Sequence, residues 1–132
     1  MKRSIFALIA GLALWVLVAS LLNRGLRAGI PGYALAEPTL NFTLGMKVAR
    51  LILAALASLA AGVATGLIAP ARPRLPWVLG AVILAMFIPV HIQLWAKFPV
   101  WYHLTFLGTL VPLVALGAAL TAGRANVASS LM

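Results

Sequence analysis

Residues 48–69 read VARLILAALASLAAGVATGLIA, and this stretch decides the class of fold. Arg50 is its one charged residue. A helix that spans the hydrocarbon core of a bilayer needs about 20 mostly apolar residues. The backbone of such a segment must satisfy its hydrogen bonds internally, which a helix does. The stretch therefore predicts a transmembrane helix.

Three further apolar runs have a similar length, so the predicted spans cover residues 4–22, 48–69, 77–95 and 100–121. Prolines interrupt the chain between the second and third spans and again at Pro99, where one helix stops and the next begins. We expect residues 1–132 to form a single all-α integral membrane domain, an antiparallel bundle of four transmembrane helices. The longer loop between the first two spans leaves room for an interfacial helix that begins near Pro38.

The composition points to lipid as the solvent of this chain. Of its 132 residues, 64% are hydrophobic and 8% are charged, and the net charge is +9 with Glu37 as the single acidic residue. An ordinary soluble domain has about a quarter of its residues charged. The basic residues stand at the edges of the apolar runs, where they meet anionic lipid headgroups. We therefore expect the lipid bilayer as a partner, and no nucleic acid.

The expected location is the bacterial inner (plasma) membrane, with a multi-pass topology. The ten basic residues divide five and five between the two sides that the four spans define, so the positive-inside rule does not decide the orientation. The first helix usually dominates the choice of orientation. Together with the positive N-terminus, this tendency favours both termini on the cytoplasmic side.

Small residues recur every four positions along the second span, at Ala54, Ser58, Gly62 and Gly66. Residues at this spacing share one face of a helix. Small side chains on one face allow helix backbones to approach closely in lipid. We expect this face to pack within the bundle, and a homo-oligomer interface is the alternative.

Two basic residues, Lys47 and Arg50, lie at the start of the same span. A charge near the membrane edge needs a partner. We expect both side chains to reach lipid phosphates. The alternative is an ion pair between Arg50 and Glu37, which would fix the first loop over the bundle.

The segment 91–104, HIQLWAKFPVWYHL, joins the third and fourth spans. Tryptophan and tyrosine favour the headgroup level, where the ring is half buried and its polar atom stays hydrated. We therefore predict an interfacial belt of Trp95, Trp101 and Tyr102 on this side of the membrane. Trp77 is predicted to mark the opposite surface.

The same segment holds both histidines, His91 and His103, which a tight turn would place at similar depth. We expect each ring to bond a backbone carbonyl, a threonine or interfacial water. The alternative is a cofactor-binding site for haem, a quinone or a divalent metal. Zinc usually takes three or four protein ligands, and two neighbouring helices are too close to hold haem between them, so either would require a second chain.

Catalytic chemistry finds little support, because Glu37 stands alone and the chain has neither aspartate nor cysteine. We expect a non-catalytic protein without a cofactor, an accessory, assembly or lipid-contacting subunit of a homo-oligomer or larger membrane complex. One alternative is a small metal-, haem- or quinone-binding membrane protein that uses His91 and His103. Another is a small oligomeric transporter or channel, although no buried acid is present to couple ions.

Overall fold

The computed structural model describes the backbone of residues 2–131 and the side chains of residues 2–121. Its elements are α1 (Lys2–Gly29), α2 (Tyr33–Ala36), α3 (Leu44–Ile68), α4 (Leu75–Gln93) and α5 (Val100–Leu131). Four of them, α1, α3, α4 and the part of α5 up to Thr121, are long and apolar enough to cross a membrane. The predicted all-helical class with four membrane-length helices is therefore confirmed.

The helices begin and end at residues with clear local signals. Thr43 caps α3, because its hydroxyl oxygen accepts a hydrogen bond from the backbone nitrogen of Met46 at 3.3 Å, and α3 therefore starts before the predicted Val48. Pro76 stands in the first turn of α4, where a missing N–H costs nothing. Gly32, at φ 82°, adopts the left-handed conformation that reverses the chain after α1.

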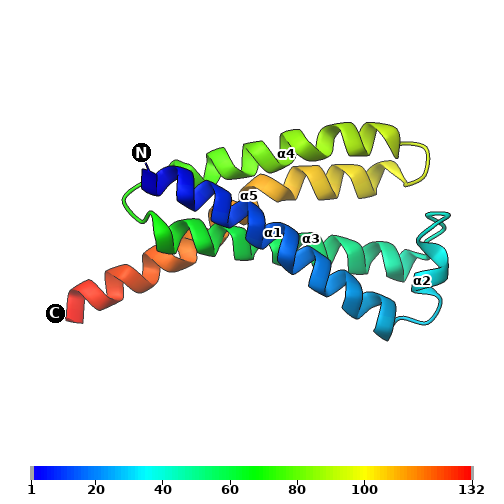
Figure 1. The fold of residues 1–132 in the computed structure, drawn as a ribbon, viewed down its shortest axis with the longest axis horizontal. Helices are drawn as coiled ribbons and strands as arrows, with labels where there is room; N and C mark the ends of the chain where they lie inside the picture. The colour runs from blue at the N-terminus through cyan, green and yellow to red at the C-terminus, as the bar shows by residue number, and fades with distance from the viewer. Residues whose placement is uncertain (1, 132) are drawn as a thin grey trace.

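The two chain ends lie at the same end of the molecule, and α2 and the α4–α5 turn lie at the other (Figure 1). The central helix is α3, which packs extensively against α1 and α5, while α4 packs mainly on α5. Helix α1 makes few contacts with α4, and the two diverge towards the α2 end (Figure 1).

Helices α3 and α5 approach each other through glycine. A methyl group on Gly62 would lie 1.9 Å from the carbonyl oxygen of Val114, and one on Gly117 would lie 2.2 Å from the carbonyl oxygen of Leu59. A methyl group on Gly66 would lie 2.1 Å from the hydroxyl of Thr121. These two glycines of the small-residue face thus pack inside the chain, against α5.

The part of the same face nearer the start of α3 contacts α1 instead. Ser58 is buried and accepts a hydrogen bond from Trp15 Nε1 at 3.0 Å, while its own hydroxyl donates to the carbonyl oxygen of Ala54 at 2.8 Å. Trp15 is 6% exposed and belongs to the main core cluster. A tryptophan in the middle of an apolar span is therefore satisfied by a serine of the neighbouring helix.

Replacement of Gly62 by alanine should destabilise the protein, because the added methyl group forces α3 and α5 apart. Overpacking of this kind costs about 1–3 kcal/mol. Gly108→Ala is the matched control, since a methyl group there has no neighbour within 4 Å and alanine is the better helix former. Thermal unfolding in detergent, followed by circular dichroism, should show a lower melting temperature for Gly62→Ala alone. Equal melting temperatures for the two variants would contradict the close contact.

Candidate functional site

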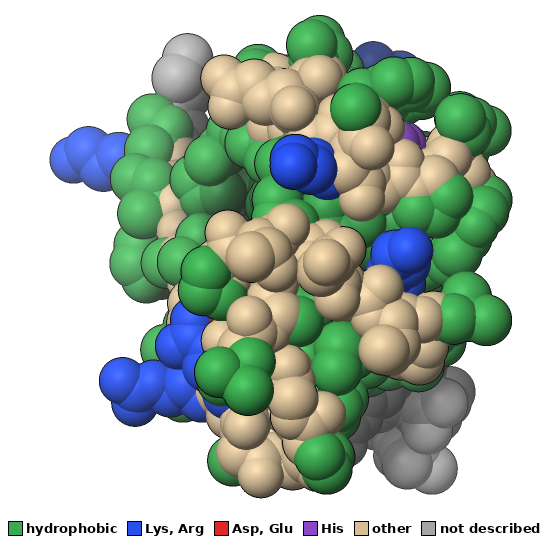
Figure 2. All heavy atoms as spheres, turned by 90° about the vertical axis from the view of Figure 1, so that its right-hand side faces the viewer, with side chains coloured by type: hydrophobic (Ala, Val, Ile, Leu, Met, Phe, Trp, Pro, Cys, Tyr) green, Lys and Arg blue, Asp and Glu red, His purple; other side chains and the backbone are tan. Residues whose placement is uncertain are grey.

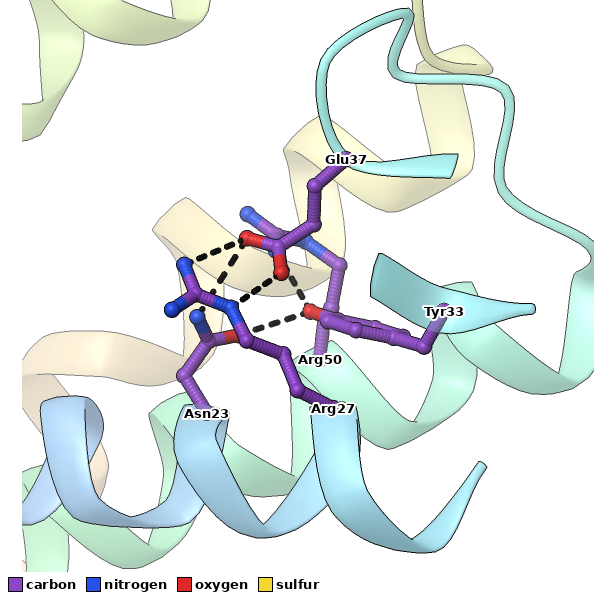
Figure 3. A network of polar contacts seen from close by, with 5 residues as sticks. All are labelled: Asn23, Arg27, Tyr33, Glu37 and Arg50. Carbon is purple, nitrogen blue, oxygen red and sulfur yellow. Dashed lines mark hydrogen bonds and ion pairs between the residues drawn. The ribbon is translucent and has the colours of Figure 1, made fainter. Parts of the chain in front are cut away.

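Polar side chains from three segments meet at the α2 end of the molecule (Figure 3). Asn23 and Arg27 lie one turn apart near the end of α1, so they share a face of that helix. Tyr33 belongs to α2, Glu37 follows it, and Arg50 lies in the second turn of α3. The reversal at Gly32 folds α2 and Glu37 back over α1 and α3.

Glu37 pairs with Arg27. The Nε of Arg27 donates to Oε1 of Glu37 and its Nη2 donates to Oε2 at 3.0 Å, while Asn23 Nδ2 donates to Oε2 at 3.4 Å. The hydrogen bond from Arg27 is the main cause that holds the pKa of Glu37 below its ordinary value, and burial opposes it. The ion pair between Arg50 and Glu37, which the sequence analysis gave as the alternative, is therefore corrected. The turn brings Glu37 to α1, where its carboxylate pairs with Arg27.

Arg50 is held by phenol oxygens instead of a carboxylate. Its Nη1 donates to the hydroxyl of Tyr33 at 2.8 Å and its Nε donates to the hydroxyl of Tyr102 at 3.2 Å. Its guanidinium carbon lies 4.8 Å from the ring centre of Phe42, a cation–π distance. The Tyr33 hydroxyl in turn donates to Asn23 Oδ1 at 2.8 Å. Across the described side chains the ion pair is that of Arg27 with Glu37, so the positive charge of Arg50 is solvated by neutral groups.

The predicted belt residues behave in two ways. Trp77, Trp95 and Trp101 are 53%, 48% and 41% exposed, which leaves their rings available to lipid. Tyr102 is only 3% exposed, stacks on Phe98 with ring centres 4.4 Å apart, and accepts the hydrogen bond from Arg50. The expected half-buried ring with a hydrated polar atom is therefore corrected for Tyr102, because its ring is buried and its hydroxyl is satisfied inside the protein.

His91 of α4 and His103 of α5 form one hydrogen-bonded pair. Their Nδ1 atoms lie 2.7 Å apart, and Nε2 of His103 lies 3.3 Å from the backbone oxygen of Trp95. Both rings are buried, and the Trp95 ring stacks on His103 at 4.6 Å and 13°. The expected carbonyl bond is present for His103, but the two rings also satisfy each other, which we did not expect.

The partners of the pair fix its protons. A carbonyl oxygen can only accept, so Nε2 of His103 carries a hydrogen. The Nδ1 of a neutral His103 is then an acceptor, and Nδ1 of His91 is the donor. Nε2 of His91 remains as an acceptor. The pair therefore forms a directed path of hydrogen bonds from α4 to the backbone of the α4–α5 turn.

The pair as built does not fit a metal or haem between its rings. Ring nitrogens 2.7 Å apart are at hydrogen-bond distance and leave no room for an ion between them. Among the described residues no group of three or more His, Cys, Asp or Glu side chains is placed to hold a metal ion. Zinc sites usually need three or four such ligands.

Three residues of this region were not predicted from the sequence to belong to a site. Asn23, Arg27 and Tyr33 carried no motif, although Asn23 and Arg27 stand four residues apart at the end of a span and close to the only acid. No protein-family model, curated protein or solved structure matches the chain.

The two histidines should be energetically coupled. His91→Leu or His103→Leu alone leaves a buried nitrogen of the partner without its hydrogen bond, which costs about 1–3 kcal/mol. The double variant should cost less than the sum, with a coupling of about 0.5–3 kcal/mol. His91→Asn should be milder than His91→Leu, because its amide keeps a donor near the Nδ1 position. Chemical unfolding in mixed micelles measures the cycle, and strictly additive losses would refute the pair.

Proposed function

We propose that this chain is a non-catalytic multi-pass protein of the bacterial inner membrane, an accessory or assembly subunit that holds anionic lipid at its two ends. The observation that carries the proposal is the outward face of the four long helices. In the most apolar 18-residue stretch of each helix, between 17% and 33% of the residues are buried within the chain. The remaining apolar surface would be costly in water, and lipid tails solvate it.

The ends of the helices supply the second half of the proposal. Lysine and arginine side chains stand at several places around the end that carries α2 (Figure 2). Lys2 and Arg3 begin α1 at the other end, and Arg72 and Arg74 lie in the α3–α4 connection there. Each such residue near an anionic membrane surface contributes about 1 kcal/mol of attraction. In this proposal Lys47, half-buried near the start of α3, reaches lipid phosphate.

The proposed topology is an antiparallel bundle with both termini in the cytoplasm. Its support is the position of the two chain ends at one end of the molecule (Figure 1). The α2 end, with the α4–α5 turn, then faces the opposite side of the membrane. The interfacial helix expected to begin near Pro38 is corrected: residues 37–43 form turns and irregular backbone, and the short helix of this loop, α2 (Tyr33–Ala36), ends before Pro38.

Reporter fusions test this topology. A green fluorescent protein fused after residue 72 or after residue 132 should fluoresce, because it remains in the cytoplasm. Alkaline phosphatase fused after residue 35 or residue 97 should be active, because it is exported. Opposite locations for the fusions after residues 72 and 132 would overturn the arrangement.

Native mass spectrometry tests the lipid preference. Protein extracted into neutral detergent should retain phosphatidylglycerol over phosphatidylcholine by at least about tenfold at low salt, equivalent to about 1.4 kcal/mol. The combined variant Lys2→Gln, Arg3→Gln, Arg72→Gln, Arg74→Gln should bind fewer anionic lipids. Ser4→Ala is the neutral control. Salt should reduce the preference, because exposed charges are screened, and no preference at any ionic strength would refute the proposal.

A further inference from the structure

A cavity of about 320 Å³ lies beside Arg50. Helix α1, the first loop, α3, α4 and α5 all contribute to its wall, which consists of Trp15, Ala19, Ser20, Asn23, Glu37, Arg50, Leu53, Phe87, Tyr102 and Phe106. Two of these residues, Trp15 and Phe87, pack against each other with ring centres 4.9 Å apart. The lining residues of α1, from Trp15 to Asn23, lie in the half of that helix nearer the α2 end, towards which α1 and α4 diverge (Figure 1).

Arg50 brings unused hydrogen-bonding capacity to this cavity. Its Nε and Nη1 atoms donate to Tyr102 and Tyr33, and Nη2 bonds no described side chain. None of the buried side-chain nitrogens in the described part of the chain lacks a partner, so Nη2 must be accessible. Arg50 lines the cavity, and its guanidinium therefore offers N–H groups to a ligand there.

The charge at the cavity is positive. Arg27 and Glu37 pair with each other, which leaves the charge of Arg50 over. Both oxygens of Glu37 are already engaged by Arg27 and Asn23, so the carboxylate competes little for Arg50. Guanidinium groups bind carboxylate and phosphate strongly, often through two parallel hydrogen bonds. A polar wall near Asn23 and an apolar wall of Trp15, Phe87 and Phe106 then suit a molecule with one anionic end and one apolar end.

We propose that this cavity binds one anionic amphiphile, with its carboxylate or phosphate head on Arg50 and its apolar tail directed outwards between α1 and α4. The inference rests on the proposed location in a membrane, which supplies such ligands. It differs from lipid attraction at the helix ends, because it assigns a single saturable site with one molecule per chain. In this arrangement the aromatic rings of the cavity wall surround the part of the tail next to the head. The phenols of Tyr33 and Tyr102 hold Arg50 in position for the head.

Quenching of Trp15 fluorescence reports on this site, since its ring lines the cavity. The background variant carries phenylalanine at Trp77, Trp95 and Trp101, so that Trp15 is the only tryptophan. Titration with dibromostearate in neutral micelles should give saturable quenching at one molecule per chain. A zwitterionic brominated phosphatidylcholine should require at least tenfold more ligand. Equal quenching by both probes would overturn the proposal.

Variants separate the role of Arg50 from that of charge in general. Arg50→Gln should weaken the binding of dibromostearate at least tenfold. Arg24→Gln is the matched control, because Arg24 is also near the α2 end of the molecule, is exposed and does not line the cavity. It should bind within twofold of the background variant. Unchanged binding by Arg50→Gln would refute the site.

A second variant keeps the test valid if Arg50→Gln does not fold. Ser20 lines the cavity and is exposed, so Ser20→Phe should narrow the cavity entrance without disturbing the core. It should also reduce quenching at least tenfold, and normal quenching would refute the site. Displacement of the probe by unlabelled oleate assigns a fatty acid as ligand, displacement by phosphatidylglycerol assigns a phospholipid, and displacement by neither overturns the proposal. A general preference for anionic lipid that survives Arg50→Gln would leave the proposed function intact while this inference fails.

Discussion

The close contact of α3 with α5 is the interaction on which the rest of the arrangement depends. Gly62 faces the backbone of Val114, and Gly117 faces the backbone of Leu59, so each helix presents a glycine to the carbonyl of the other. Expulsion of water does not drive the association of helices in lipid, and packing must supply it. With α3 held on α5 in this way, α1 also packs against α3, and α4 lies against α5. Arg50, in the second turn of α3, thereby meets Tyr33 of α2 and Tyr102 of α5.

Features that depend on local sequence were predictable, and partners across the fold were not. Four apolar helices follow from run length, and the similar depth of His91 and His103 follows from the short turn at residues 94–99. The partner of Glu37 depends on the reversal at Gly32, which selects Arg27 on α1 over Arg50 on α3. A residue pattern cannot express which way a loop folds back over two helices.

The tryptophan and tyrosine assignments illustrate the same limit. Trp15 and Ser58 are 43 residues apart, and only the packing of α1 on α3 reveals that they share a hydrogen bond. Tyr102 was expected at the headgroup level on chemical preference alone. The neighbouring cation Arg50 and the ring of Phe98 provide a buried alternative that satisfies both its polar and apolar parts.

The two halves of the molecule are held together in different ways. Close to the chain ends, α3 and α5 are packed backbone to backbone through small residues. Towards α2, a connected series of polar contacts runs from Arg27 and Glu37 through Asn23 and Tyr33 to Arg50 and Tyr102. The ring of His91 stacks on Tyr102 with centres 6.2 Å apart, so an aromatic contact joins this series to the histidine pair.

A buried polar network is stable only when its members are satisfied. In the described part of this one, every buried side-chain nitrogen and oxygen has a partner, and the unused N–H groups of Arg50 are accessible beside a cavity. The network therefore holds the guanidinium of Arg50 rigidly in place, at a small cost in free energy. Its spare donors belong to a residue of the cavity wall, and for that reason we infer that ligand chemistry is concentrated in this half of the protein.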